Sequence, residues 1–452
     1  MACESEYEEN VDNLRKLFKA NNIVSFNIQH IQCSAGSSSG DNYMSVVKRI
    51  QIRGHHNCDN YRDSNFMSVI IKRQIPSLSR RQLYRCDEAF CNEIMAYNHV
   101  IPLLDRYMSE SVFPKCFYAG HDDVGEIIVL EDLKEIGYRM QNRLTGLDLN
   151  FCELVMKQLA KFHAASIAAQ RLDNAMFRDK CKQVCEIVYC KEAEEFYKNI
   201  LETSIQESLN SLRSSNVDGC LTEPIRLIEK LQYKLFAKIQ CYITNPPDHM
   251  SVMCHGDLWM NNIMFTTTSS SRDSSNKSIT DDADCQQNGA KAANRVPSDV
   301  KFFDLQAMRF ASPVFDILHF IYTSTKRDLR DLYTTHLLEI YALALSSNLE
   351  EQFTHSSSDL DSLRDTYSLP NITTEYYKHV LYGLAICMWI LPAVTFDPNN
   401  IPNLDAISEM NRSAKEIKCT QKLTPEYHSR LRDLALEFYQ NGYLNLSHID
   451  DQ

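Results

Sequence analysis

"SVMCHGDLWMNNIMF", residues 251–265, places His255, Gly256 and Asp257 between two apolar segments, and Asn262 follows Asp257 by five positions. This composition fits two interpretations. One is a capped polar turn in which the Asp and Asn side chains bond to nearby backbone. The other is a tight loop that turns a carboxylate and an amide into one cleft. The stretch alone does not choose between them.

A second segment, "VKFFDLQ" at residues 300–306, favours the cleft. It is short and apolar, so we expect it to pair with Ile263–Phe265 as a hairpin that brings Asp304 close to Asp257 and Asn262. Two carboxylates and an amide carbonyl provide hard oxygen ligands for Mg²⁺ and leave one acid as a base. Phosphoryl transfer needs this set, because the metal neutralises phosphate charge and the base orients the attacking hydroxyl.

The spacing between Asp257 and Asn262 is that of the protein-kinase catalytic loop, and Asp304 takes the place of the kinase DFG aspartate, with Leu305 and Gln306 after it. We therefore predict Asp257 as the catalytic base. Asn262 and Asp304 are the predicted Mg²⁺ ligands.

A lysine and a glutamate upstream complete a nucleotide-binding set. Lys72 lies in "MSVIIKRQIP" (67–76), which has the composition of a strand, and Glu93 lies in the helical pattern that follows. A lysine on such a strand reaches the α- and β-phosphates of ATP, and an acid on the next helix holds it. Each residue alone is typical of a solvated surface. Their order along the chain favours the ion pair.

Two further segments are candidates for contacts with the nucleotide. "SAGSSSGDN" (34–42) contains Gly36 and Gly40, whose backbone N–H groups could cover phosphates, although most stretches of this kind are ordinary hairpin turns. "VLEDLK" (129–134) is placed as a hinge, where backbone groups near Glu131 and Leu133 would contact a purine.

The pattern of the chain predicts an α+β fold with two lobes. After an amphipathic helix within residues 1–20, the order strand–strand–strand–helix–strand runs to about residue 130, and helical patterns dominate from there on. We expect a small β-rich N-lobe with one helix at 1–132, and a larger, mainly helical C-lobe at 133–452. The segment Thr266–Asp299 is rich in Ser, Asp and Asn, so we predict a disordered loop there.

The net charge and the cysteine spacing argue against binders of nucleic acid or anionic membranes and against a disulfide framework. The 452 residues carry a formal net charge of -12, which argues against a general binder of nucleic acid or of anionic membranes. The 16 cysteines contain no CxxC pair, as is typical of reduced thiols in a cytoplasmic protein. A metal site at Cys181, Cys185 and Cys190 stays open as an alternative.

No membrane span or signal peptide is predicted. The N-terminus is too charged for a signal peptide, and the apolar stretch Val380–Phe396 is just short of a span and contains Pro392, so we interpret it as a core helix. A spanning helix is the alternative. Among isolated residues, His163 is expected to be a packed core histidine, with a catalytic role as the alternative. Trp259 fits either the core or the wall of an acceptor pocket.

Several of these motifs together resemble the insect ecdysteroid kinase-like family, a branch of the choline kinase and aminoglycoside phosphotransferase superfamily. The resemblance lies in "VIIKRQIP" (69–76), "NEIMAYNHVIP" (92–102), "VLEDL" (129–133), "LAKFHAAS" (159–166), "HGDLWMNNIMF" (255–265) and "FFDLQAMRFASPVFDILHFIYTS" (302–324). They follow the family order along most of the chain. Two departures are the sequence D-L-Q in place of D-F-Q and the length of the segment 266–299.

The resemblance implies a protein-kinase-like fold and phosphorylation of a small-molecule hydroxyl with ATP and Mg²⁺. It implies the same roles for Asp257, Asn262, Asp304, Lys72 and Glu93 as the residue patterns do. The implied acceptors are ecdysteroids, or plant and xenobiotic alcohols and phenols, with detoxification as one purpose. No obligate protein partner is indicated.

Two rival functions remain. One is a catalytically inactive protein that keeps the fold as a ligand sink. The other is a protein kinase, against which stands the absence of a recognisable activation segment after Gln306. The acceptor pocket is expected to draw on residues 170–245 and on the helical region after 312, where no short motif encodes its shape.

Overall fold

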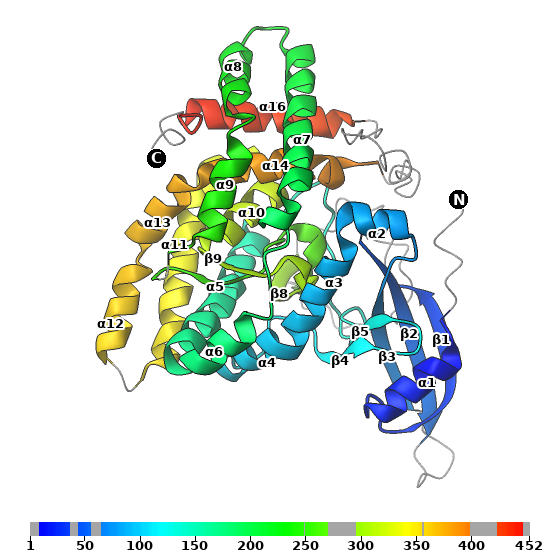
Figure 1. Cartoon of the computed structure of the whole chain (residues 1–452). Helices are drawn as coiled ribbons and strands as arrows, with labels where there is room; N and C mark the ends of the chain where they lie inside the picture. Colours follow the sequence, from blue (N-terminus) through cyan, green and yellow to red (C-terminus); the bar gives the residue numbers. More distant parts are fainter. Residues whose placement is uncertain are drawn as a thin grey trace.

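The computed structural model describes residues 9–36, 44–55, 65–247, 249–269, 295–354, 357–397 and 423–445 (Figure 1). One end of the molecule is a β-sheet and the other a larger assembly of helices. The mixed α+β class expected from the sequence is therefore confirmed. The division of the chain at residues 132 and 133 stays a prediction.

The sheet has five antiparallel strands in the order β1-β2-β3-β5-β4. Its strands are β1 (Asn27–Ala35), β2 (Ser45–His55), β3 (Asn65–Gln74), β4 (Cys116–His121) and β5 (Glu126–Glu131).

Alternation along the strands gives the sheet two different faces. One face carries Val69 and Ile71 and packs against helix α1 (Val11–Ala20), as the amphipathic pattern of that helix predicts. Lys72 lies opposite Ile128 in the register of β3 and β5, and Ile128 belongs to the main core together with residues of helix α3. The pleat therefore directs Lys72 to the face of the sheet that packs against α3, opposite the face covered by α1.

The expectation of four strands and one helix in this part is wrong in two respects. The edge strand β4 was missed because its "CFYAGH" sequence is mostly half-buried and has no clear apolar alternation. The single expected helix is several segments: α2 (Leu78–Tyr84), α3 (Cys86–Met95), a π-helical turn η1 (Ala96–Val100), α4 (Ile101–Leu104) and η2 (Asp105–Tyr107). Arg85, with φ of 53°, separates α2 from α3.

The rest of the chain is mainly helical. Its helices are α5 (Leu149–Leu172), α6 (Asn174–Cys181), η3 (Lys191–Ala193), α7 (Glu194–Ser215), α8 (Thr222–Leu231), α9 (Leu235–Thr244), α10 (Val314–Ser324), α11 (Arg327–Gln352), α12 (Ser357–Thr366), α13 (Leu369–Lys378), α14 (Val380–Thr395) and α16 (Pro425–Gln440). All residues of α10 are buried, and α10 packs against α14 at the centre of this assembly.

Two small antiparallel sheets, each of two strands, complete the described fold. Strand β6 (Val252–Cys254) pairs with β9 (Arg309–Ala311), and β7 (Ile263–Ser269) pairs with β8 (Arg295–Phe302). The 3₁₀ turn η4 (Met260–Asn262) lies between Asp257 and β7. The 3₁₀ turn η6 (Leu305–Ala307) lies between Asp304 and β9.

The predicted disorder of Thr266–Asp299 is wrong at both ends of that segment. Thr266 pairs with Asp299 and Thr268 with Val296, so β7 and β8 extend well beyond the two short strands expected. The β-branched threonines favour the extended backbone, and the Tyr138 hydroxyl donates a hydrogen bond to the carboxylate of Asp299. Residues 270–294 lie outside the described residues.

The apolar stretch at 380–396 forms the buried core helix that was expected, although Pro392 lies inside α14 and does not end it. Within the described residues no single helix is long and apolar enough to cross a membrane. One bent pair, Ser358–Lys378 with Val380–Thr395, passes the length and composition criteria, with an angle of 54° between its parts.

The crossing of α10 and α14 gives a stability prediction. Gly383 approaches the Tyr322 ring so closely that a Cβ atom there would lie 2.3 Å from a ring carbon. We expect Gly383→Ala to lower the free energy of unfolding by about 1–3 kcal/mol through overpacking, measured as a lower midpoint of thermal unfolding. In a Tyr322→Leu background the same substitution should be nearly neutral, and an equal effect in both backgrounds would contradict the explanation.

Candidate active site

A glycine with positive φ leads the chain from β6 to Asp257. Gly256 has φ of +83°, and a Cβ at this position would lie 1.9 Å from the carbonyl oxygen of Ala307. Both the conformation and the close approach require glycine. The turn thereby brings Asp257 next to the segment that follows Asp304.

Asp316, on the buried helix α10, holds this turn in place. One of its carboxylate oxygens accepts the His255 N–H at 2.6 Å, and the other accepts the Gly256 N–H at 2.9 Å. Burial alone would raise the pKa of Asp316, but the hydrogen bond and charge interaction with His163 and the Gly256 N–H overcome that effect and lower it. A buried anion thus stabilises two backbone N–H groups of the turn.

The sequence reasoning did not assign this role to Asp316. A signal was present, because "VFDILHFIY" places one acid within an otherwise apolar helix. A carboxylate at such a position is rarely buried without hydrogen-bond donors facing it.

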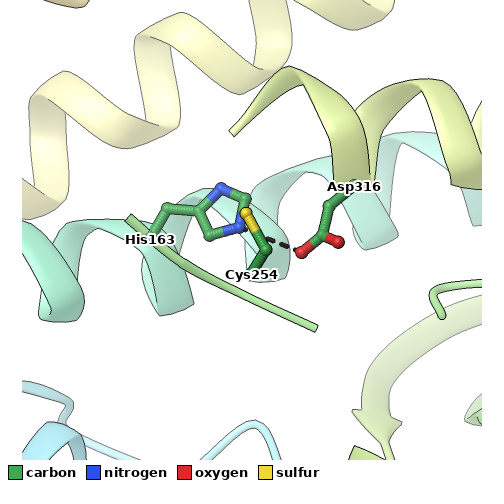
Figure 2. A group of neighbouring side chains, drawn as sticks. All are labelled: His163, Cys254 and Asp316. Carbon is green, nitrogen blue, oxygen red and sulfur yellow. Dashed lines mark hydrogen bonds and ion pairs between the residues drawn. The ribbon is translucent and has the colours of Figure 1, made fainter. Parts of the chain in front are cut away.

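Figure 2 shows His163 and Cys254 beside Asp316. The side-chain atoms of these three residues that could bind a metal all lie within 4.8 Å of one another. Hydrogen bonds already use these atoms: His163 bonds to the Tyr341 hydroxyl at 2.8 Å and to Asp316 at 3.3 Å. Burial raises the pKa of the Cys254 thiol well above its usual value, so it stays protonated and is a poor metal ligand. We interpret the group as a hydrogen-bonded core network.

Asp257 is bound to Asn262 through both its backbone and its side chain. The Asn262 amide Nδ2 donates to the Asp257 carbonyl at 2.9 Å and to its carboxylate Oδ2 at 3.0 Å. Features of both interpretations of the turn are therefore present, because Asn262 caps local backbone and also orients the acid. Trp259, between them in sequence, is buried.

The electrostatic environment of Asp257 disfavours its ionised form. Burial, followed by repulsion from Asp304, raises its pKa to about 7, against the hydrogen bond from Asn262 and the charges of Arg309 and Lys72. Its side chain is still 21% exposed, so the residue is not sealed from solvent.

Lys72 connects the sheet to both the helix α3 and the segment after β8. Its Nζ lies 2.5 Å from a carboxylate oxygen of Glu93 and 2.5 Å from one of Asp304. Burial alone would lower the pKa of Lys72, but these two anions raise it, so the ammonium stays charged. The structure therefore brings Lys72, Glu93 and Asp304 together, although Lys72 and Asp304 are 232 positions apart in the sequence.

Asp304 adopts a left-handed conformation, with φ of 68°, which is uncommon for a residue other than glycine. The N–H of the preceding residue, Phe303, donates a hydrogen bond to the Asn262 carbonyl at 3.1 Å. This bond keeps the segment of Asp304 adjacent to that of Asn262. Among the described residues, neither Asn262 Oδ1 nor Asp304 Oδ2 has a protein hydrogen-bond partner. An amide oxygen and a carboxylate oxygen of this kind fit a Mg²⁺ ion.

The other predicted nucleotide contacts differ in whether their backbone N–H groups are already hydrogen-bonded within the protein. At the expected hinge, the Glu131 N–H donates to the Lys115 carbonyl at 2.8 Å, whereas the Leu133 N–H donates no hydrogen bond within the described part of the chain. The Gly36 N–H is used by the β1–β2 ladder, where it donates to the Val47 carbonyl at 3.0 Å. Gly40 lies outside the described residues.

Arg309 is a further buried group near Asp257 that the sequence reasoning missed. Its guanidinium donates to the Gly256 carbonyl at 2.8 Å and pairs with Glu186 at 3.2 Å.

The three cysteines considered for a metal site, Cys181, Cys185 and Cys190, form no cluster of potential metal ligands in the described residues, and Cys185 is exposed.

The Asp316 anchor gives a second stability prediction. Asp316→Asn replaces a carboxylate oxygen that faces an N–H donor with an NH₂ group, which leaves buried donors unpaired. We expect a loss of about 2–4 kcal/mol in the free energy of unfolding, measured by thermal or urea unfolding. The matched control is Asp331→Asn, which alters a surface acid paired with Arg327 and should change stability little. Equal effects of the two substitutions would contradict an anchoring role.

Comparison with known proteins places the chain in a family. The family model described as the ecdysteroid kinase-like family matches residues 39–280 and 290–352. No curated protein matches the sequence. A structural neighbour is the GDP complex of wild-type aminoglycoside 2'-phosphotransferase-IIIa, with 14% identity over 96% of this chain and 100% of that chain and a TM-score of 0.35.

Another neighbour is a choline/ethanolamine kinase family protein from Mesorhizobium loti, with 10% identity over 83% of this chain and 99% of that chain and a TM-score of 0.30. The assignment rests on the family match, which spans most of the chain and includes Lys72, Glu93, Asp257, Asn262 and Asp304. The chain belongs to the ecdysteroid kinase-like family and is a small-molecule kinase, a phosphotransferase that acts on hydroxyl groups.

Proposed function

We propose that this protein transfers the γ-phosphoryl group of ATP, with Mg²⁺, to a hydroxyl of an ecdysteroid or of a plant or xenobiotic alcohol or phenol. The observation that carries the proposal is the meeting of Asp257 and Asn262 with the Lys72–Glu93–Asp304 ion-pair set at one place between sheet and helices. Their residue types are those that phosphoryl transfer requires.

In this proposal Asp257 is the base that accepts and orients the hydroxyl proton of the acceptor. Its carboxylate is held by Asn262 at 3.0 Å and is partly exposed, so an acceptor hydroxyl can reach it. The hydrogen bond to Asn262 limits rotation of the carboxylate and so presents it in one orientation.

Lys72 places the phosphates, and Glu93 places Lys72. The Lys72 ammonium projects from a rigid strand and is held by the buried Glu93 carboxylate, whose side chain is only 1% exposed. The Lys72 ammonium also pairs with Asp304, which supports a position for it between anionic groups on both sides. When phosphates enter, the ammonium is positioned to interact with them at little reorganisation.

Asn262 and Asp304 would hold the metal through their unpaired oxygens. Mg²⁺ bound there would supply charge neutralisation for the transferred group. The Leu133 N–H, at the expected hinge, is available to the adenine ring. Attachment of phosphate would make a steroid or phenol polar, which suits storage or detoxification in the cytoplasm.

The assigned base is tested with purified protein, ATP, Mg²⁺ and a panel of ecdysteroids, plant alcohols and phenols, with products followed by mass spectrometry. The wild type should add one phosphate to at least one member of the panel. Asp257→Asn keeps the shape of the side chain but removes the base, so we expect turnover to fall by roughly 100-fold or more.

Asp361→Asn is the matched control, because this acid on α12 is 76% exposed and lies in a different element. It should leave turnover unchanged. Equal turnover by wild type and Asp257→Asn would refute the role of Asp257. Stabilisation of the protein by ATP and Mg²⁺, without turnover of any alcohol, would instead support the inactive ligand-binding alternative.

Lys72→Met tests the nucleotide side of the site separately. We expect roughly a 100-fold loss of turnover, because one preorganised cationic group is removed from the phosphates. Glu93→Gln keeps the ammonium but weakens its support, so its effect should be smaller, and the double variant should lose less than the two single losses combined. Strictly additive losses, measured by steady-state kinetics with varied ATP, would argue against a coupled pair.

A further inference from the structure

His319 lies one turn beyond Asp316 on α10 and points toward the proposed base. Its side chain is 2% exposed. Its Nε2 is 3.4 Å from Asp257 Oδ1, and its Nδ1 is 3.3 Å from the Tyr382 hydroxyl on α14. Within the described part of the chain, Nε2 is a buried polar atom with no hydrogen-bond partner of good geometry. Such an atom calls for a physical explanation.

The surroundings of His319 keep its ring neutral. Burial lowers its pKa to about 3, although the charge of Asp316 acts in the opposite direction. A neutral imidazole has one N–H, so only one of its nitrogens can donate. The nitrogen that carries the proton is decided by the partners on the two sides of the ring.

The two partners favour the same tautomer. The Tyr382 hydroxyl can donate to Nδ1, and a proton on Nε2 then faces the Asp257 carboxylate. The opposite tautomer would direct the Nε2 lone pair at a carboxylate oxygen, which is repulsive when Asp257 is ionised.

Asn262 occupies the other carboxylate oxygen of Asp257, Oδ2, at 3.0 Å. We propose that His319 is a positioning residue that holds Asp257 through Oδ1, and that Tyr382 fixes the tautomer that allows it to do so. The two supports, from η4 and from α10, restrain both ends of the carboxylate. Each oxygen keeps a second lone pair, so one stays available to the acceptor hydroxyl. This inference rests on the proposed role of Asp257 in phosphoryl transfer.

The test compares His319→Leu with His319→Gln, using the acceptor that the wild type phosphorylates. Glutamine can place an amide N–H where Nε2 lies, whereas leucine fills the space without a donor. We expect His319→Leu to lower kcat roughly 10- to 100-fold, the effect of losing a hydrogen bond to a charged group, with much smaller changes in KM for ATP and acceptor. His319→Gln should recover most of the activity, and Tyr382→Phe should fall between the two.

His379→Gln is the control for disturbance of packing. This histidine is also buried and lies near α10, but its Nε2 bonds to Glu375 at 2.9 Å and it does not contact Asp257. It should keep the wild-type kcat per folded molecule. Equal kcat values for the leucine and glutamine variants of His319 would overturn the inference. An inactive wild type would instead refute the proposed function, and the inference with it.

A second measurement does not depend on turnover. In protein labelled with ¹⁵N-histidine, the signal that is missing from the His319→Gln spectrum reports the tautomer of His319. We expect the proton on Nε2. A proton on Nδ1 would overturn the inference even if the enzyme is active.

Discussion

The buried carboxylate of Asp316 is the contact on which the geometry of the site depends. It accepts two successive backbone N–H groups, those of His255 and Gly256, and its position on a fully buried helix leaves it little freedom. The turn is thereby fixed to the core of the helical assembly and not to a surface loop. His163 and Tyr341 extend the same network to α5 and α11, the longest helices of the structure, so several elements determine where Asp257 lies.

A comparable restraint fixes α3, which carries Glu93. The neighbouring Asn92 donates to the Gln306 carbonyl at 2.9 Å, and its Oδ1 accepts the Cys185 N–H at 2.8 Å. Because Gln306 follows Asp304 closely, this hydrogen bond joins the helix that supports Lys72 to the segment that carries Asp304. The ion pairs of Lys72 then link the sheet to a preformed surface, which is what preorganised electrostatic stabilisation requires.

The sequence predicted those parts of the fold that have local signals. The apolar face of α1, the strand that carries Lys72 and the hairpin after Asn262 follow from periodicity and turn composition. The pairing of Lys72 with Glu93 was predicted from their order along the chain. The contact of Lys72 with Asp304 was not predicted, because periodicity does not measure the distance between remote segments.

Other parts had no local signal. Strand β4 was missed because an edge strand with half-buried residues lacks strict alternation. The ends of the segment 266–299 were mistaken for disorder because polar composition outweighed the β-branched threonines, whereas pairing with the opposite strand satisfies their backbone. The positions of His319 and Arg309 beside the turn became visible only in the folded structure.

The replacement of Phe by Leu in the D-L-Q segment has a simple structural explanation. Leu305 is fully buried and belongs to the main apolar core, so the position requires apolar volume and not an aromatic ring. The adjacent left-handed backbone at Asp304 is what aims the carboxylate, and this conformation does not depend on the ring.

The balance of charge at the site bears on the metal ion of the proposed function. Three carboxylates, those of Glu93, Asp257 and Asp304, face the single ammonium of Lys72, while the nearby Arg309 is paired with Glu186. A triphosphate that entered alone would meet an excess of negative charge, and Coulomb repulsion in a partly buried site is poorly screened. In the proposed function, a divalent cation held by Asn262 and Asp304 would offset this excess of negative charge. Repulsion from Asp304, which adds to the effect of burial on the pKa of Asp257, belongs to the same excess of negative charge. If the protein acts as proposed, this excess would favour ATP bound together with Mg²⁺ over the free nucleotide.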